Sequence, residues 1–247
     1  MVVGLLRQDM SWSTGSFRSL SEARDALLEL VVGGFNVAAL TETEHAAYAG
    51  RLSQWSQGLE AYLATRRHDS PLSAAETRTV AMLRLHMQNA SINLKACPPG
   101  TYGAELMLWD QFKPMFAKML EYAAIAMGLD SQNPPGEQPL FHTELGIVSA
   151  LISIAGKCRD PLIRRSAIAL MLADTVQEGV WSSVLASRVA RRIVTMEEAG
   201  RDVRSARDVP AEARRRQLRV HISSENRQAK IFYRFLHIAC EEVLQWQ

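Results

Sequence analysis

Helix start signals recur in this sequence and favour a largely helical fold. A Ser or Thr is followed three residues later by Glu at three points, namely Ser19 with Glu22, Thr41 with Glu44 and Ser73 with Glu76. In this pattern each side chain accepts a hydrogen bond from the backbone near the other, so donors at the helix start gain partners. Apolar residues at spacings of three and four follow each pair, as is typical of amphipathic helices.

These runs end at residues that stop helices. Gly33 ends the first run, Pro71 ends the second, and the sequence CPPG at 97–100 ends the third. A fourth helix is expected over 105–127. Pro114 inside it predicts a kink or a later start, because proline lacks a backbone N–H and clashes within a helix.

Two tightly linked helices are expected next. The run 145–155 is apolar on most sides, as in a helix near the centre of a bundle. Asp160 and Pro161 provide an N-cap and a first-turn residue for the following helix. We expect a helical hairpin whose second helix exposes Arg164 and Arg165 and buries Leu162, Ala167, Leu170 and Met171.

The C-terminal part changes from helical to alternating periodicity. A helix predicted over 182–199 ends at Gly200. The segments QLRVHIS and AKIFYRF then alternate apolar with polar residues around SENRQ, which predicts a β-hairpin. The longer segment AKIFYRFLHIACEEVLQW is also compatible with a helix. We therefore predict an all-α fold of stacked helical hairpins in one domain over 17–247, with a small C-terminal β-hairpin, after an N-terminal extension at 1–16.

Composition is that of an ordinary globular protein. The chain has 28 Lys plus Arg against 26 Asp plus Glu, and 47% of its residues are hydrophobic, so charge alone demands neither a nucleic acid nor a membrane. Cys97, Cys158 and Cys240 are odd in number and widely spaced, which favours free thiols in the cytosol or nucleus. The apolar patch near Met1 is too short for a signal peptide or a membrane span.

The motifs of common enzyme and metal sites are absent from the sequence. It has no Gly-rich phosphate loop, GxSxG or HExxH, and its cysteines are not paired as in a zinc site. His142 and Glu144 lie two residues apart, on different faces of a helix, so a helix-start role is favoured over metal binding. Glu197 and Glu198 are expected on a solvated face. We predict no catalytic residue, cofactor or metal.

Three further features have mainly structural interpretations. Seven arginines against three acids in the segment 201–219 suit phosphate contacts or nuclear import, but the segment lacks aromatic residues between its basic ones, and a solvated linker is favoured. Trp181 stands at a helix junction, where an aromatic residue is more often a packing anchor than part of a pocket. His86 is expected to face away from the apolar stripe of its helix.

Four motifs occur in order over 141–198. They are E-x-G-I from Glu144 to Ile147, KCRDPLIRRSAI from Lys157 to Ile168, EGVW from Glu178 to Trp181, and the Glu197-Glu198 pair. In this order they resemble the C-terminal regulatory region of fungal zinc-cluster (Zn2Cys6) transcription factors. The segment FRSLSEARDAL and the hairpin candidate are similar to parts of the same region. The resemblance covers about Phe17 to Phe235.

The motif residues have a structural interpretation. Cys158, Arg159 and Asp160 with the following proline form a corner between two helices. Arg164 and Arg165 lie one turn later, and can pair with Glu178 or with the Glu197-Glu198 acids to hold successive helices in register. The alternative is an effector pocket, for which the candidate residues are His142, Glu144, Arg159, Glu178 and Trp181.

The resemblance implies transcription regulation in the nucleus. The family's DNA reader uses six cysteines and two zinc ions, and this sequence lacks that motif, so we expect no DNA binding by a zinc cluster. The expected partner is a protein, either a full-length zinc-cluster relative or a second copy, and the expected setting is a fungal secondary-metabolite pathway. Alternatives are a small-molecule binder or repurposed biosynthetic enzyme, a cytoplasmic location, a gene remnant, or a regulatory half whose zinc-cluster exon lies upstream of Met1.

Overall fold

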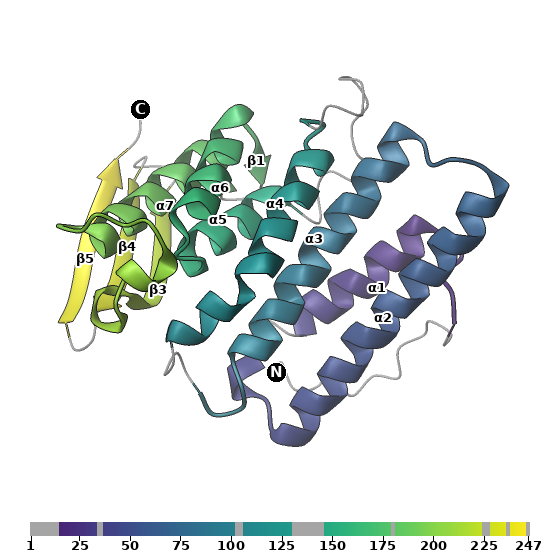
Figure 1. Ribbon diagram of the computed structural model, residues 1–247, viewed down its shortest axis with the longest axis horizontal. Coiled ribbons are helices and arrows are strands. Elements are labelled where there is room, and N and C mark those ends of the chain that lie inside the picture. Colours follow the sequence, from purple (N-terminus) through teal and green to yellow (C-terminus); the bar gives the residue numbers. More distant parts are fainter. Residues whose placement is uncertain are drawn as a thin grey trace. The chain divides into compact units, whose positions relative to one another are not determined.

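The computed structural model describes residues 15–33, 37–101, 106–129, 146–178, 181–223, 228–235 and 238–245. Within these ranges the chain forms seven α-helices and five strands, most of which are labelled in Figure 1. The helices are α1 (Leu20–Gly33), α2 (Glu42–Asp69), α3 (Ala74–Ala96), α4 (Lys113–Ala126), α5 (Ile147–Lys157), α6 (Pro161–Ala173) and α7 (Ser183–Glu198). The strands are β1 (Gln177–Glu178), β2 (Trp181–Ser182), β3 (Arg215–Ser223), β4 (Gln228–Phe235) and β5 (Ile238–Gln245). The predicted all-α class with a small β element is confirmed.

The predicted capping boxes set the starts of the two longest helices. At α2, Thr41 accepts a hydrogen bond from the backbone N–H of Glu44, whose carboxylate accepts one from Thr41 in return. Ser73 and Glu76 do the same at α3. Each reciprocal pair satisfies two backbone donors that would otherwise lack partners, which explains why both predicted starts are confirmed.

The fourth helix begins later than the full range 105–127, as Pro114 indicated. A 3-10 helix (Leu106–Phe112) comes first, and α4 starts at Lys113. Pro114 therefore lies in the first turn, where its missing N–H leaves no helical hydrogen bond unmade.

Contacts divide the chain into two compact units, 1–102 with 121–145 and 103–120 with 146–247. The division falls within α4. The prediction of a single domain over 17–247 stays a prediction, and the predicted N-terminal extension falls almost entirely on residues outside the described ranges.

The first unit contains α1, α2 and α3, which pack against one another. Two aromatic side chains of α2 also hydrogen-bond to α1. Trp55 Nε1 donates to the Ala23 carbonyl at 2.8 Å, and the Tyr48 hydroxyl donates to the Leu30 carbonyl at 3.0 Å. Burial raises the pKa of Tyr48 to about 12, so this hydroxyl stays a donor at all ordinary pH values.

Helix α3 is buried around most of its circumference, because it packs against α1, α2 and the short 3-10 helix Val37–Ala39. His86, which was expected to face away from the apolar stripe of this helix, is nonetheless buried, with 5% of its surface exposed. The apolar stripe described only one of the faces that α3 buries.

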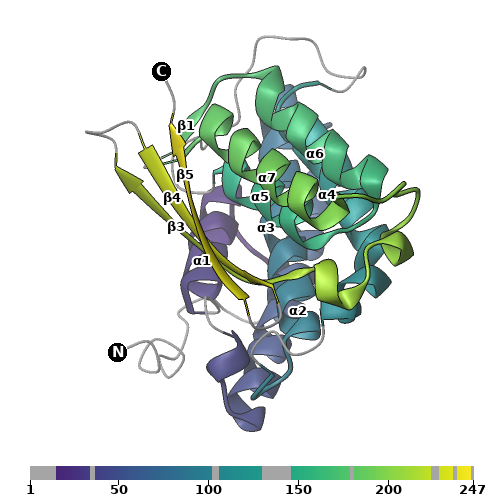
Figure 2. The same ribbon diagram turned by 90° about the vertical axis from the view of Figure 1, so that its left-hand side faces the viewer.

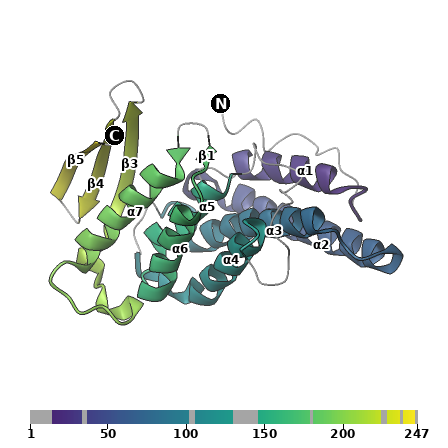
Figure 3. The same ribbon diagram turned by 90° about the horizontal axis from the view of Figure 1, so that it is seen from above.

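In the second unit, α5, α6 and α7 form a group of mutually contacting helices. The predicted hairpin of α5 and α6 is confirmed. One face of α7 contacts α5 and α6, and another packs against the sheet, as Figures 2 and 3 show. On the sheet side, Val189 and Ile193 lie in a buried cluster with Ile231 of β4. Helix α7 is thus held between helices and strands, with Val189 and Ile193 fully buried.

The C-terminal sheet is an antiparallel meander in the order β3-β4-β5. The predicted hairpin corresponds to β3 and β4, which pair Val220 with Ile231. The chain adds a third strand, so the helical interpretation of its last described segment is wrong. Alternation in β5 directs Glu242 and Leu244 to the α7 side, where Glu242 pairs with Arg192 and Leu244 packs on the buried cluster.

No helix in the described part of the chain is both long and apolar enough to cross a membrane.

Replacing Ile193 by Ala tests the packing of α7 between helices and sheet. Loss of this buried side chain is expected to lower the free energy of unfolding by about 2 to 5 kcal/mol. The matched control, Val243→Ala, trims a side chain that is 48% exposed on the same sheet, and should change stability by less than about 0.5 kcal/mol. Urea unfolding followed by circular dichroism measures both. Equal losses would contradict the packing described.

Candidate functional site

The predicted corner between α5 and α6 begins a network of hydrogen bonds and ion pairs in the second unit. Asp160 Oδ1 accepts hydrogen bonds from the backbone N–H groups of Leu162, at 3.1 Å, and Ile163, at 3.2 Å, as an N-cap does. Lys113 Nζ lies 2.6 Å from Oδ2. Burial alone would raise the pKa of Asp160, but the Lys113 contact and the backbone hydrogen bonds outweigh burial and lower this pKa.

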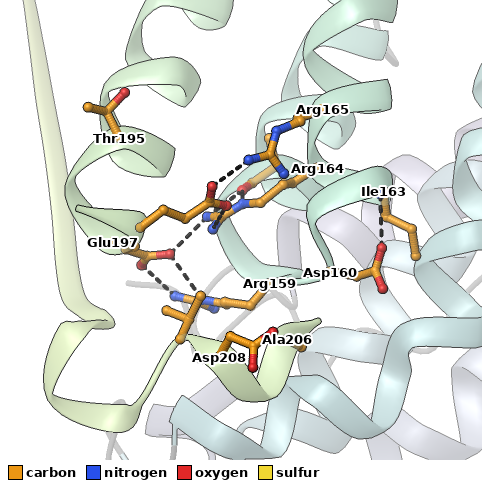
Figure 4. A network of polar contacts seen from close by, with 12 residues as sticks. Arg159, Asp160, Ile163, Arg164, Arg165, Thr195, Glu197, Ala206 and Asp208 are labelled. Atoms are coloured by element: carbon orange, nitrogen blue, oxygen red, sulfur yellow. Dashed lines mark hydrogen bonds and ion pairs between the residues drawn. The ribbon is translucent and has the colours of Figure 1, made fainter. Parts of the chain in front are cut away.

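Glu197, in the last turn of α7, is the centre of a network of ion pairs (Figure 4). Arg159 binds it with two hydrogen bonds, from Nε at 3.2 Å and from Nη2 at 2.9 Å. Arg164 Nη2 donates to Oε2 at 2.8 Å, and the backbone N–H of Arg215 donates to Oε1 at 3.0 Å. Each carboxylate oxygen thus accepts two hydrogen bonds, and the side chain is fully buried.

Glu198 continues the network towards the surface. Arg164 Nη1 donates to one of its oxygens at 3.3 Å, and Arg165 Nη2 donates to the other at 2.6 Å. The Arg165 side chain is 53% exposed, whereas that of Arg164 is fully buried. The predicted pairing of Arg164 and Arg165 with the Glu197-Glu198 acids is confirmed.

The same arginines complete the C-terminal end of α5. A helix leaves its last four carbonyl groups without helical partners. Here the Ala155 carbonyl accepts from Arg164, the Gly156 carbonyl from Arg215, and the Lys157 carbonyl from Arg159. The fourth, that of Ile154, accepts from the backbone N–H of Cys158. Positive charge also suits this end of a helix dipole.

A carboxylate completes the N-terminal end of α5. Glu178 in β1 accepts hydrogen bonds from the backbone N–H groups of Ile147, at 2.7 Å, and Val148, at 2.9 Å. Gly146 is the N-cap, and a Cβ at this position would overlap the Glu178 carboxylate. A Cβ at Gly156 would likewise overlap the guanidinium of Arg215. Glycine at both ends of α5 makes room for the charged groups that cap it.

Electrostatics keep this network charged. Burial alone would raise the pKa of Glu197, but the positive charges of Arg159 and Arg164 outweigh burial and lower this pKa to about 2. Burial lowers the pKa of Arg159, and the charge of Glu197 opposes that shift. Arg159, Arg164 and Glu197 therefore form a fixed set of charges that hydrogen-bond to one another and to the end of α5.

Three burial predictions are wrong, and this network explains two of them. Arg164 was expected to be exposed and is fully buried. Glu197 and Glu198 were expected on a solvated face, yet Glu197 is fully buried and the Glu198 side chain is only 11% exposed. Arg164 and Glu197 are buried because each satisfies the other and because Arg164 also donates to the Ala155 carbonyl of α5. Leu162 was expected in the core but is 78% exposed, since it lies in the first turn of α6 on a side away from α5 and α7.

The structure places the remaining site candidates as follows. Trp181 is half-buried and packs against the core cluster of α7, which is the packing role favoured for it. Cys158 is buried, and burial raises its pKa to about 11, so its thiol is not activated for reaction. His142 and Glu144 lie outside the described residues. No group of His, Cys, Asp and Glu suited to a metal ion occurs where the structure describes the chain.

Sequence reasoning missed the role of the last arginines of the basic segment. Arg214 is fully buried, and its guanidinium binds Asp110 with two hydrogen bonds, at 2.8 and 2.7 Å. Arg214 and Arg215 therefore contradict the interpretation of the segment as a solvated linker, whereas Arg201 and Arg207 are exposed as expected. Three consecutive arginines at 214–216, directly before the alternating segment QLRVHIS, were the available signal.

A comparison with curated proteins finds one relevant similarity. The chain is 37% identical over 116 residues to the aspercryptin biosynthesis cluster-specific transcription regulator atnN of Emericella nidulans. The match covers 43% of this chain and 18% of the relative, so the chain spans less than a fifth of that protein. The chain thus contains a region related to a fungal transcription regulator. No family model matches it. No solved structure matches it either.

A double-mutant cycle tests the fit between Gly146 and Glu178. Gly146→Ala is expected to lower the free energy of unfolding by about 1 to 3 kcal/mol, because the new methyl group displaces the carboxylate cap. In a Glu178→Ala background the same change should cost clearly less, because the overlapping group is gone. Gly50→Ala in α2, where a Cβ meets open space, is the control, and should stabilise slightly. Additive losses at Gly146 and Glu178 would disprove the coupling.

Acid titration tests the charge on Glu197. A lowered pKa in the folded state contributes stability that is present above about pH 4.5 and is lost as the pH falls through about 2. This contribution is about 3 kcal/mol at most. The difference in unfolding free energy between the wild type and Glu197→Gln should therefore shrink as the pH falls from 5 to 2, measured by urea unfolding at each pH. A difference that does not change with pH would contradict a charged Glu197.

Proposed function

We propose that the chain acts in transcription regulation of a fungal secondary-metabolite pathway, and that it acts in the nucleus through protein partners. The observation that carries this proposal is the 37% identity to a cluster-specific transcription regulator. That protein is named as the specific regulator of one biosynthetic gene cluster. The resemblance of the motifs over 141–198 to the regulatory region of zinc-cluster factors points the same way.

The chemistry of the motif residues supports a regulatory scaffold over an enzyme. Arg159, Arg164 and Glu197 bind one another or cap α5, and Glu178 caps its other end. An active site needs polar groups that face a substrate. In the described part of the chain these groups face protein atoms instead. Their structural role is therefore enough to explain why these residues occur together in the motif.

DNA binding by a zinc cluster is not part of the proposal for these 247 residues. A zinc cluster of this family needs six cysteines, and the sequence has three. We propose that the chain reaches promoters through a protein that carries its own DNA reader, such as a full-length zinc-cluster relative. Mapping the 5′ end of the native transcript distinguishes this from a longer product whose upstream exon encodes the six cysteines.

Deletion of the gene in the organism that carries it tests the regulatory function. We expect the transcripts of a biosynthetic gene cluster to change together, and to return to normal when the chain is expressed from another locus. RNA sequencing of the deletion and complemented strains, grown under conditions that induce the cluster, measures this.

The same strains test the alternative of a binder or enzyme within the pathway. If every cluster transcript is unchanged while one intermediate accumulates in the deletion strain, the regulatory proposal is wrong. A complementing chain with Glu178→Gln then shows whether that residue also serves the pathway's chemistry.

A further inference from the structure

An open groove lies between α6 and α7, on a side of α7 that the sheet does not cover. The groove has a volume of about 650 Å³. Its floor is apolar, with Ile168 and Val194 buried and Leu172 43% exposed. Ala169 and Ala173 stand one turn apart on α6, and their small side chains leave the depth that larger ones would fill.

The shape of the groove suits a helix. Helix α6 has 13 residues, so the groove's wall is at most about 20 Å long, the length of three to four helical turns. An open groove of this kind leaves much of a small molecule in contact with water, whereas small-molecule sites bury most of their ligand. An amphipathic helix needs only one face covered, and it buries residues spaced by three and four in such a groove.

The rim of the groove is basic. Arg191 on α7 is exposed and has no ion pair among the described residues. Arg165 on α6 is half-exposed and uses one of its five N–H groups on Glu198. The charge of Glu198 is in turn shared by Arg164 and Arg165, so the acid on this rim is already compensated. The remaining charge attracts carboxylates.

We infer that the α6/α7 groove binds an amphipathic helix with acidic residues on the flanks of its apolar face, supplied by a protein partner. The apolar face covers Leu172 and Val194, and the acidic flanks pair with Arg191 and Arg165. The inference rests on the proposed regulatory function for its biological meaning, because it names the kind of partner through which the chain acts. The buried network fixes the spacing of the two walls, since Arg164 on α6 binds Glu197 on α7.

A displayed peptide library tests the inference. The probe is a phage library of random helical peptides of about 13 residues, selected on the full purified chain. Enriched peptides are then synthesised, and their binding is measured by fluorescence anisotropy at low and high salt. Three variants are compared, namely Leu172→Glu on the groove floor, Arg191→Glu on its rim, and Leu162→Glu as the matched control. Leu162 is a more exposed leucine of the same helix that does not line the groove.

The expected result is enrichment of acidic peptides with apolar residues at helical spacing, whose binding weakens with salt. Leu172→Glu and Arg191→Glu should each weaken binding by about tenfold or more. Leu162→Glu should change it by less than about twofold. Circular dichroism and thermal melting establish that the three variants fold alike.

Several results would overturn the inference. They are no enrichment, enrichment of basic or aperiodic peptides, and binding that survives Leu172→Glu. Sedimentation velocity adds another, because a wild-type dimer that Leu172→Glu converts to a monomer, with no peptide enriched, would make the occupant a second copy.

Strains separate this outcome from that of the proposed function. Cluster transcripts that respond to gene deletion but not to the Leu172→Glu allele would retain the regulatory function and reject the groove as its partner site. Acidic peptides that bind in the groove, together with a deletion that leaves all transcripts unchanged, would retain the groove as a binding site and reject the regulatory function.

Discussion

The carbonyl groups at the C-terminal end of α5 need hydrogen-bond donors, and the second unit is arranged around that requirement. This end lies in the interior, where an unpaired carbonyl group is costly. Arg159, Arg164 and Arg215 each donate to one of three successive carbonyls, and the burial of their charges is offset by Glu197. One requirement thus ties the end of α5 to α6, to α7 and to the first strand of the sheet.

Glycine gives the complementary half of this arrangement. Charged groups can approach a helix terminus closely only where no side chain intervenes, and Gly146 and Gly156 provide that space at opposite ends of α5. The spacing of the motifs follows from this geometry. E-x-G-I supplies the N-terminus to be capped, and EGVW supplies Glu178, which caps it. Two segments more than thirty residues apart therefore form one helix cap.

Sequence patterns predicted the elements well and the burial of charged residues poorly. Capping signals such as Ser73 with Glu76 are local, because donor and acceptor lie within one turn, so the sequence contains the whole interaction. The burial of Arg164 depends on Glu197 and on the Ala155 carbonyl, which only the fold brings together. The pairing of Arg214 with Asp110 joins residues 104 positions apart, and no periodicity reports such a contact. The third strand was missed because its alternation is mixed with a helix-compatible pattern.

Buried ion pairs are often replaceable by well-packed apolar residues without loss of stability, because desolvation consumes most of their attraction. Apolar residues cannot replace the arginines of this network in the same way. An apolar residue at 159, 164 or 215 would remove a guanidinium and leave a carbonyl of α5 buried without a partner, a loss that packing cannot restore. Only a group with several donors can bind both a carboxylate and a carbonyl, and arginine has five in a rigid plane. The network therefore specifies how α5, α6 and α7 sit against one another, and with them the walls of the groove between α6 and α7.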